Sequence, residues 1–457
     1  MKTLLIQAPP RGKEPRDHLV PPLGLAYLAS TMEKHGKSVQ ILDAYAEGLT
    51  WGEFEEREKA SGAQVLGFTG MSPVIDTTFK AIRIARPSAE HIILGGPHAT
   101  AYKEKVFEQC PEVDSVIYGE GEETFLELLS ALERGGSLSG IPGVITKSTT
   151  GPPRRPIKNL DSLPPPARHL LPNHLYRYPL APGKRVTTMF VTRGCPFSCT
   201  FCDTSVFGQL YRVRSPENVV NEMEDAVNTY RAQTIIFYDD LFTVKKPWVL
   251  SVCKEIIRRS VRVDWKCESR VDIIDAEMLE AMKEAGCSLI AYGVESGNQK
   301  TLDYLQKKTT LEDARRAFHL TKKAGIQPMA YFILGVPVET WEDALRTIDF
   351  SIELDPAYVQ FSILSPTYGT RAYEEAMTHR WLAEVDARNP YDRDLKRPVM
   401  LSPNWDEEKL RKIIKIAYRR FYLRPGYIMK RILSLVGLRG LVGTFATGLR
   451  FLRWLIR

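Results

Sequence analysis

Short runs of apolar, β-branched residues alternate with amphipathic stretches over residues 1–145. The runs predict strands, and the stretches between them show the spacing of helices. Strands that alternate with helices predict an α/β domain with a Rossmann-like, doubly wound parallel sheet. The expected strands are 3–7, 38–42, 64–68, 91–94 and 115–118, and the expected helices are 23–35, 77–86, 103–109 and 124–134.

The same alternation starts again at residue 186. Before it, residues 146–185 contain the proline-rich stretch 163–172, which predicts a stiff, extended linker. Six parallel strands that alternate with helices predict a partly open, TIM-type (β/α)6 barrel over residues 186–370, with functional residues at the carboxyl ends of its strands. Residues 371–457 are expected to form a further helical region. The expected barrel strands are 186–191, 234–238, 263–268, 288–294, 326–334 and 358–364, and the expected helices are 216–230, 247–259, 275–284, 311–324 and 341–353.

Loops at the carboxyl ends of the first set of strands combine glycine with small polar residues. Doubly wound sheets bind ligands beyond this edge, and glycine lets the backbone approach a bulky group. Each loop alone is explained by ordinary turn glycine, but four such loops on one edge favour a large cofactor. We expect a turn or capping role for the loop histidine more than metal ligation. The candidate contacts are Thr69, Met71, Ser72, Gly95, Gly96, His98, Gly119, Glu120 and Gly121.

The composition is that of a soluble globular protein, with 44% hydrophobic and 26% charged residues in 457. That length suggests two or three domains. Residues 1–10 reach two prolines before an apolar core of secretory length accumulates, so we expect no signal peptide and a cytoplasmic location. In that compartment seven cysteines, an odd number, favour thiols or metal ligands over disulfides.

Three of the cysteines, Cys195, Cys199 and Cys202, lie within eight residues in the loop after the first expected barrel strand. A structural zinc site takes four protein ligands, and no fourth stands at a suitable spacing. A zinc site completed by a distant His or Asp stays open as an alternative, as does a set of buried thiols. A cubane iron–sulfur cluster has four irons, so three thiolates leave one iron open to a small molecule. The remaining cysteines stand singly among apolar residues and are expected to be core thiols, with a second cluster as the alternative: Cys110, Cys253, Cys267 and Cys287.

The pattern Cys-x3-Cys-x2-Cys, with the aromatic Phe201 before its last cysteine, resembles that of the radical S-adenosylmethionine (SAM) enzymes. The resemblance implies a [4Fe-4S] cluster whose open iron binds SAM, and a 5′-deoxyadenosyl radical formed when one electron cleaves SAM. Loops 95–100 and 118–124 make the first domain similar to the cobalamin-binding domain of the class B members. Cobalamin is therefore a third expected cofactor, and a reducing donor such as flavodoxin or ferredoxin is an expected partner. The two resemblances cover residues 1–370.

The resemblance also implies SAM contacts at the carboxyl ends of the barrel strands. It implies a backbone contact of Phe201 with adenine, and contacts of other residues with the methionyl group or ribose of SAM. Carboxylates at strand ends also cap the following helix, so a structural role stays open. The residues that match are Asp239, Asp240, Glu268, Arg270, Glu295 and Ser296.

The long cobalamin-binding pattern Asp-x-His-x-x-Gly is missing from the sequence. A histidine ligand beneath the cobalt is therefore not indicated. The lower face of cobalamin is expected over loop 67–74, with the cofactor beneath Met71. Some relatives keep this domain shape without the cofactor, and that alternative stays open.

The positive charge is concentrated at the end of the chain. The net charge is +7, and residues 409–457 contain thirteen Lys and Arg and no Asp or Glu. Apolar residues at helical spacing favour an interfacial helix on an anionic membrane surface, with a helical cap on the barrel as the alternative. Arginines interrupt the tail too often for a spanning helix. Nucleic acid is the least expected partner, because no reading module accompanies the charge. The apolar face of the first segment comprises Leu410, Ile413, Ile414, Ala417 and Phe421, and the apolar residues expected to meet the membrane near the end of the chain are Phe451, Leu452, Trp454 and Leu455.

Together these features predict a membrane-associated, cobalamin-dependent radical SAM enzyme. The primary interpretation is a methyltransferase that uses the 5′-deoxyadenosyl radical and methylcobalamin on an unactivated carbon of a hydrophobic small molecule, such as a lipid, an isoprenoid or a tetrapyrrole. The alternative is a non-methylating oxidative cyclase or ring-rearranging enzyme that resembles the anaerobic magnesium-protoporphyrin IX monomethyl ester cyclase. A non-catalytic or RNA-directed module that uses the basic tail is a third hypothesis.

Overall fold

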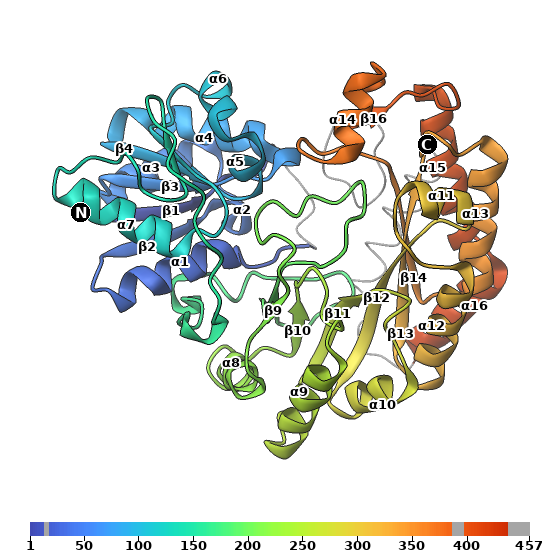
Figure 1. The fold of residues 1–457 in the computed structure, drawn as a ribbon. Helices are drawn as coiled ribbons and strands as arrows, with labels where there is room; N and C mark the ends of the chain where they lie inside the picture. The colour runs from blue at the N-terminus through green and yellow to red at the C-terminus, as the bar shows by residue number, and fades with distance from the viewer. Residues whose placement is uncertain (13–17, 386–396, 437–457) are drawn as a thin grey trace.

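A six-stranded sheet forms the centre of the first part of the chain, drawn in blue and teal in Figure 1. The structure, a computed structural model, describes residues 1–12, 18–385 and 397–436. The strand order is β2-β1-β3-β4-β5-β6, with β1 to β5 parallel and β6 antiparallel to β5. The strands are β1 (Thr3–Gln7), β2 (Val39–Asp43), β3 (Val65–Thr69), β4 (His91–Gly95), β5 (Ser115–Ile117) and β6 (Val144–Thr146). The five strands predicted over residues 1–145, which correspond to β1 to β5, are confirmed to within one residue at each end.

Helices cover both faces of this sheet. The sheet therefore lies between two apolar cores. α1 (Leu23–Lys34) and α7 (Glu122–Glu133) pack on one face, around Met32 and Leu128. The remaining helices lie on the opposite side or at the edges: α2 (Ala44–Glu47), α3 (Trp51–Ser61), η1 (Ser72–Val74), α4 (Ile75–Ala85), η2 (Arg86–Ser88), α5 (Pro97–Tyr102), η3 (Lys103–Lys105) and α6 (Val106–Gln109). Both faces of a mostly parallel sheet are thus covered, which confirms the doubly wound, Rossmann-like fold.

The sequence pattern does not predict α3 or β6. α3 buries only Phe54 and Glu58, so its apolar periodicity is faint. Its start is fixed instead by a capping box, in which Thr50 and Glu53 each accept a hydrogen bond from the other's backbone N–H. β6 has three residues and pairs antiparallel in a sheet whose other strands are parallel.

A second six-stranded sheet follows, in the order β14-β13-β12-β11-β10-β7, with all neighbours parallel. Its strands are β7 (Val186–Met189), β10 (Thr234–Phe237), β11 (Asp264–Ser269), β12 (Cys287–Glu295), β13 (Gln327–Leu334) and β14 (Tyr358–Ile363). The connecting helices are α8 (Pro216–Asn228), α9 (Lys246–Arg258), α10 (Ala276–Glu284), α11 (Gln299–Tyr304), α12 (Leu311–Lys323) and α13 (Trp341–Leu354). Since β7 and β14 are opposite edges of the sheet, the barrel is partly open, as predicted.

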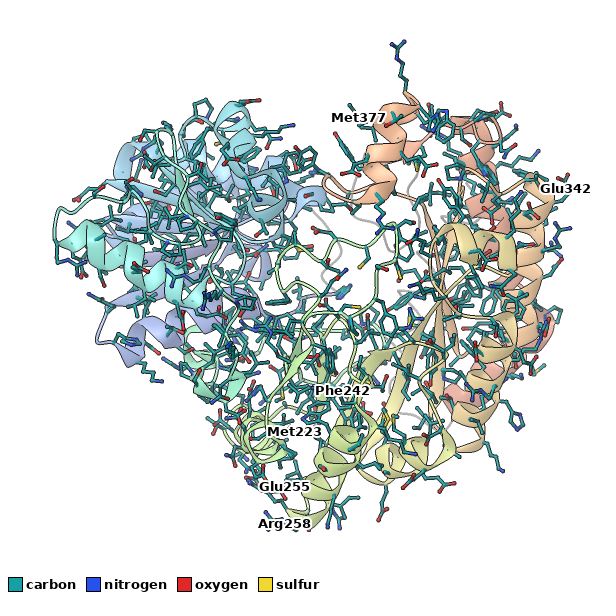
Figure 2. The ribbon with its side chains drawn as sticks, viewed as in Figure 1. Met223, Phe242, Glu255, Arg258, Glu342 and Met377 are labelled. Carbon is teal, nitrogen blue, oxygen red and sulfur yellow. The ribbon has the colours of Figure 1, made fainter. Side chains whose placement is uncertain are left out.

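The outer face of the barrel and its helices enclose one extended apolar core. Met223 of α8 and Phe242 lie between the helices and the sheet, whereas Arg258 lies exposed at the outer end of α9 (Figure 2). The helices therefore fix the positions of the strands, and the strand ends are left to carry the site.

A two-stranded antiparallel ribbon, β8 (Thr192–Arg193) and β9 (Arg212–Val213), encloses residues 194–211. We call these residues the cysteine hairpin. Gly194 closes the hairpin at its base with a φ of +86°, and a Cβ there would lie 2.4 Å from the carbonyl oxygen of Leu210. Only glycine fits at this position. In Figure 1 the hairpin is the green segment between the first domain and the yellow and orange strands.

The linker between the two sheets contains η4 (Leu160–Ser162) and η5 (Arg168–Leu170). The last part of the chain packs on the barrel and comprises α14 (Arg371–Thr378), β15 (Leu382–Val385), β16 (Arg397–Met400), α15 (Glu407–Tyr422) and α16 (Pro425–Val436). The apolar face of α15 lies in the barrel core, and the hydroxyl of Tyr418 accepts a hydrogen bond from the N–H of Phe361 at 3.1 Å. α15 is therefore a cap on the barrel, and its apolar face is not available to a membrane.

The packing of α15 does not test the predicted membrane contact of the residues that follow it. Residues 437–457 lie outside the described residues. Within the parts of the chain that the structure describes, no helix combines the length and apolar character needed to cross a membrane.

Candidate active site

The cysteine hairpin brings its three thiols near one another. Cys195 and Cys199 are half-buried, and Cys202 is exposed. Burial, followed by the nearby charges of Asp240 and Cys199, raises the pKa of the Cys195 thiol. Among the described residues, no three His, Cys, Asp or Glu side chains converge tightly enough to hold a single metal ion. A cubane cluster fits this arrangement, because its three thiolates bind three different irons.

The hairpin is anchored to the barrel at Thr200 and Phe201. The N–H of Thr200 donates to the carbonyl of Leu305 at 3.0 Å, and the N–H of Ala372 donates to the carbonyl of Thr200 at 3.0 Å. The Phe201 ring packs against an apolar cluster that includes Leu305 and Val336. The ring is thus used in packing, and the contact of the Phe201 backbone with SAM adenine stays a prediction.

Asp239 and Asp240 follow β10 but have different surroundings. The buried Asp239 accepts hydrogen bonds at Oδ1 from the N–H groups of Val191 at 2.7 Å and Thr192 at 2.6 Å. Burial raises the pKa of this carboxyl to about 7, although these hydrogen bonds lower it. Asp239 therefore holds the first strand of the hairpin ribbon. Asp240 is exposed beside Cys195 and remains a candidate for the predicted methionyl contact.

Arg270 and Glu295 are both engaged within the protein. The buried Arg270 donates to both carboxylate oxygens of Asp272 at 2.9 Å, and its guanidinium lies 3.7 Å from the ring centroid of Phe197 in the hairpin. Glu295 accepts a hydrogen bond from Nζ of Lys307 at 2.6 Å. Its φ of +68° marks a strained backbone at the end of β12, where the register with β13 shifts. Arg270 supports the hairpin, and Glu295 orients a lysine beside it.

Ser296 is fully buried and capped by other residues. Its hydroxyl lies 3.1 Å from the Thr347 hydroxyl and accepts a hydrogen bond from the N–H of Asn298 at 3.1 Å. These contacts fix the turn between β12 and α11. The contacts of Ser296 therefore favour a structural role over a contact with SAM.

Glu268 lies on the inner face of the barrel, since its neighbour Cys267 belongs to the outer core. Oε1 accepts a hydrogen bond from the Tyr331 hydroxyl at 3.2 Å. Burial raises the pKa of the carboxyl to about 7, against the lowering effect of that hydrogen bond. Of the carboxylates among the predicted SAM contacts, Glu268 and Asp240 are not fully buried, and neither forms an ion pair with a described residue.

The predicted loops of the first domain meet at one edge, as expected from parallel strands. A Cβ at Gly96, whose φ is +92°, would lie 2.8 Å from Oγ1 of Thr69, so this glycine allows two loops to approach each other. Gly119 faces open space, and Met71 is 56% exposed although it is large and apolar. Exposed apolar surface next to an open backbone fits a large planar cofactor at this edge.

His98 uses both ring nitrogens inside the protein. Nδ1 lies 3.1 Å from the Ser72 hydroxyl and Nε2 lies 2.9 Å from Oε1 of Gln109, while the ring stacks on Tyr102 at 4.1 Å between centroids. Burial lowers the pKa of the imidazole. His98 thus links η1 to α6, which is a structural role of the kind expected. Gly95 and Gly121 flank the predicted loops and remain predicted backbone contacts.

Glu120 is a predicted cofactor contact whose side chain is engaged within the protein, so the predicted contact is limited to its backbone. The side chain is buried, and its two carboxylate oxygens form ion pairs with Arg193 at 2.9 Å and Arg212 at 2.5 Å. Its charge is used between the two domains. The physical reason is that the loop after β5 meets the hairpin base, which strand assignment alone does not reveal.

Sequence reasoning missed the basic residues of the site: Lys307, Arg193 and Arg212. Lys307 is 7% exposed and lies close enough to Cys202 for its charge to act on that thiol. The available signal for Arg193 was its position two residues before the first cysteine. Lys307 lies twelve residues beyond Glu295 and carried no local signal.

Comparisons with known proteins agree with this geometry. The radical SAM superfamily model matches residues 189–351, and the B12 binding domain model matches residues 15–129. A protein of Pyrococcus horikoshii described as an uncharacterized methyltransferase is 35% identical over 419 residues, which cover 90% of each chain. The anaerobic magnesium-protoporphyrin IX monomethyl ester cyclase of Rubrivivax gelatinosus is 28% identical over 421 residues, 89% of this chain and 75% of that one.

Two solved structures share the fold. The radical SAM methyltransferase TsrM from Kitasatospora setae, with cobalamin and a [4Fe-4S] cluster bound, superposes with a TM-score of 0.74 at 18% identity and covers 93% of this chain and 90% of its own. The cobalamin-dependent radical SAM enzyme OxsB, with aqua-cobalamin and SAM bound, gives a TM-score of 0.76 at 16% identity, covering 97% and 69%.

The cysteine hairpin, the barrel and the preceding doubly wound domain therefore define a radical SAM enzyme. Within that class the chain belongs to the cobalamin-binding radical SAM family. Its cofactors are a [4Fe-4S] cluster, SAM and cobalamin.

Proposed function

We propose that this enzyme is a C-methyltransferase that acts on an unactivated carbon of a predominantly apolar small molecule. When bound, the cluster and SAM supply a radical that removes a hydrogen atom from substrate, and cobalamin supplies the methyl group. The chain holds these groups in place and excludes water from them, so no paired acid and base residues are required.

The observation that carries the proposal is the direct contact between the hairpin and the first domain. Arg193, two residues before Cys195, forms ion pairs with Glu120 in the loop after β5 and with Glu122 at the start of α7. The loop that would carry the cluster therefore adjoins the edge that would carry cobalamin. A substrate between them would meet both groups. The Pyrococcus horikoshii relative, which is described as an uncharacterized methyltransferase and matches this chain over 90% of its own length, supports the same assignment.

The barrel interior supports a substrate with an apolar body and a polar group. Leu289, Ala291 and Met329 form an apolar cluster on the inner face of β12 and β13. The half-buried Glu268 of β11 is level with Ala291, and the half-buried Tyr331 lies two residues beyond Met329 on β13. Their hydroxyl and carboxyl groups would orient a hydrogen-bonding group of the substrate.

Product analysis tests the proposal. The full chain, reconstituted without oxygen with iron, sulfide and cobalamin, would be incubated with SAM, a flavodoxin or ferredoxin donor, and lipid extract from a strain that lacks the gene. We expect S-adenosylhomocysteine and 5′-deoxyadenosine to form together, with one new methyl group per product molecule. Formation of 5′-deoxyadenosine with a dehydrogenated or cyclised product and no S-adenosylhomocysteine would contradict methyl transfer.

That contrary outcome would support the second candidate, an oxidative cyclase. The specific observation in its favour is the 28% identity to the Rubrivivax gelatinosus cyclase over 89% of this chain. The two reactions share both cofactor domains and differ in whether a methyl group reaches the product.

Peripheral membrane contact stays a prediction, now limited to residues from Pro425 onward. Ile428 and Met429 of α16 are exposed large apolar side chains, 42% and 58% accessible. They continue into the basic tail, which fits delivery of an apolar substrate from a membrane surface.

A further inference from the structure

The two arginines at the base of the cysteine hairpin share one carboxylate. Arg193 of β8 and Arg212 of β9 are paired residues of the antiparallel ribbon. Both are almost completely buried, at 4% and 6% exposure. Arg193 contacts Oε2 of Glu120 at 2.9 Å, and Arg212 contacts Oε1 at 2.5 Å. One side chain of the first domain thus holds both ends of the hairpin.

A second carboxylate strengthens this contact. Glu122, at the start of α7, forms an ion pair with Arg193 at 2.5 Å. Burial raises the pKa of the Glu122 carboxyl, but the charge and hydrogen bond of Arg193, with the charge of Arg212 and a backbone hydrogen bond, together hold the pKa below its usual range. Arg212 also donates to the carbonyl of Ile157 in the linker at 2.7 Å. The hairpin base is therefore tied to β5, α7 and the linker at once.

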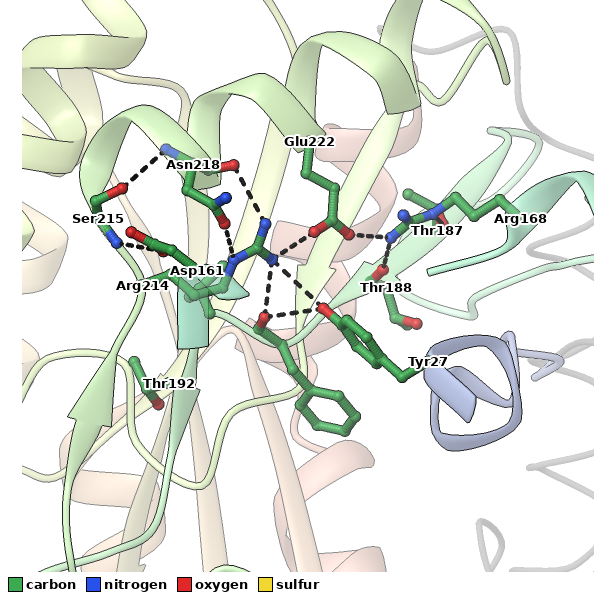
Figure 3. A network of polar contacts seen from close by, with 12 residues as sticks. Tyr27, Asp161, Arg168, Thr187, Thr188, Thr192, Arg214, Ser215, Asn218 and Glu222 are labelled. Atoms are coloured by element: carbon green, nitrogen blue, oxygen red, sulfur yellow. Dashed lines mark hydrogen bonds and ion pairs between the residues drawn. The ribbon is translucent and has the colours of Figure 1, made fainter. Parts of the chain in front are cut away.

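A neighbouring network holds the ribbon on the barrel side, as Figure 3 shows. The fully buried Glu222 of α8 pairs with Arg214, the residue after β9, and with Arg168 of the linker at 2.6 Å. The Tyr27 hydroxyl of α1 donates to the carbonyl of Phe190 at 3.4 Å, just before β8. The ribbon is thus fixed from both domains.

Buried charges make this geometry selective. A carboxylate between two guanidinium groups in a dry interface is stable only in a narrow arrangement, because any separation leaves charges buried without partners. Exposed ion pairs do not act in this way, since water replaces a lost partner. The Glu120 contacts can therefore set a distance between domains.

We propose that Glu120, with Arg193 and Arg212, is a positioning clamp that fixes the separation between the cluster carried by the hairpin and the cobalamin carried by the first domain. The three residues are positioning residues, because they act through the loops that carry the cofactors. The clamp depends on the two cofactor sites and is independent of whether the enzyme transfers a methyl group or forms a ring.

Magnetic coupling between the two cofactors tests the clamp directly. Cob(II)alamin and the reduced [4Fe-4S] cluster each carry an unpaired spin, so each broadens the electron paramagnetic resonance spectrum of the other according to their separation. The full chain and its Glu120→Gln variant would be reconstituted with both groups, and iron and cobalamin would be counted per chain. We expect the dipolar splitting to shift and broaden in Glu120→Gln at equal loading.

A matched control makes the same Glu→Gln substitution at a position away from the clamp. Glu224→Gln removes a carboxylate that pairs with Arg259 at 3.1 Å on the outer surface, where Glu224 is 37% exposed. Its spectrum should equal that of the parent. Arg212→Lys is the second test variant, because it keeps the charge at Glu120 but loses the guanidinium fork. If Glu120→Gln fails to fold or to hold its cluster, the coupling measured in Arg212→Lys tests the proposal alone.

The proposal is overturned by an unchanged splitting. If fully loaded Glu120→Gln, or Arg212→Lys in its place, shows the coupling of the parent, the contact only stabilises the fold. A merely structural role would lower thermal stability in these variants but would leave the coupling of the folded fraction untouched.

Discussion

Lys307 donates a hydrogen bond to Glu295 at 2.6 Å, and the two side chains are buried together beside the cysteine hairpin. Removal of one member would leave the other as an uncompensated buried charge. We expect Lys307→Met to lower the free energy of unfolding of the cluster-free protein by about 3–5 kcal/mol, measured by denaturant titration. The double variant Lys307→Met with Glu295→Gln should recover most of this loss, since no lone charge remains.

The exposed pair of Lys59 and Glu55 in α3, at 2.6 Å, is the control for this prediction. Lys59→Met should leave the unfolding free energy nearly unchanged, because water replaces the lost partner of an exposed pair. A loss in Lys307→Met as small as that of Lys59→Met would show that water reaches the Glu295 carboxylate, contrary to the burial of the pair.

Gly194 and Gly208 offer a matched test of the hairpin base. Both have positive φ, +86° and +69°, but a Cβ at Gly194 would lie 2.4 Å from the Leu210 carbonyl oxygen, whereas a Cβ at Gly208 meets nothing within 4 Å. Gly208→Ala carries only backbone strain, about 1–2 kcal/mol. Gly194→Ala adds a collision with backbone that cannot move without opening the ribbon.

We therefore expect Gly194→Ala to lose most of its iron after reconstitution, while Gly208→Ala keeps nearly all of it. Iron and sulfide content per chain, with the absorbance of the cluster, measures both. Equal iron content in the two variants would mean that the hairpin can re-form around an alanine at its base.

The sequence pattern predicts the strands of both sheets well, because buried parallel strands have short, strongly apolar runs between glycine-rich turns. β3 and β12 are examples, with boundaries close to those expected. The motif Cys195-x3-Cys199-x2-Cys202 predicts the cluster site because its ligands are contiguous in the chain.

Contacts between domains could not be predicted in the same way. Glu120 is expected at a cofactor because it lies in a glycine-rich loop, yet its partner Arg193 is more than seventy residues away. The apolar face of α15 equally fits a membrane or a protein surface, and only its contact with Phe361 and the barrel core decides. Pattern identifies the apolar or charged face of an element, whereas the partner depends on tertiary packing.

The seven cysteines divide into two groups that alanine substitution should separate. Cys195→Ala, Cys199→Ala and Cys202→Ala should each lose cluster absorbance and reduce 5′-deoxyadenosine formation to background, because each thiolate would hold one iron. Cys253→Ala provides the control, since this thiol is fully buried in the barrel core, where burial raises its pKa. It should keep the cluster at some cost in stability. Parental 5′-deoxyadenosine formation in any hairpin variant would overturn the ligand assignment.

Glu339 should give the protein a distinctive pH dependence. The carboxyl is fully buried in the turn after β13, where the N–H of Gly335 donates to Oε2 at 2.9 Å. Burial raises its pKa from 4.5 to about 8, although that hydrogen bond lowers it. A carboxyl with a higher pKa in the folded state binds more protons when folded. Its contribution to stability is therefore complete below pH 4.5 and is lost as the pH rises toward 8.

We expect Glu339→Gln to remove this dependence. Relative to the parent, the variant should gain on the order of 2–4 kcal/mol in unfolding free energy between about pH 5 and about pH 8, measured by denaturant titration of the cluster-free protein. Asp343→Asn is the control: burial would raise the pKa of Asp343, but hydrogen bonds from Thr340 and Arg346 hold it below its usual value. The difference in unfolding free energy between Asp343→Asn and the parent should be the same at both pH values. A constant difference for Glu339→Gln as well would show that the Glu339 carboxylate is stabilised as an anion in the folded protein.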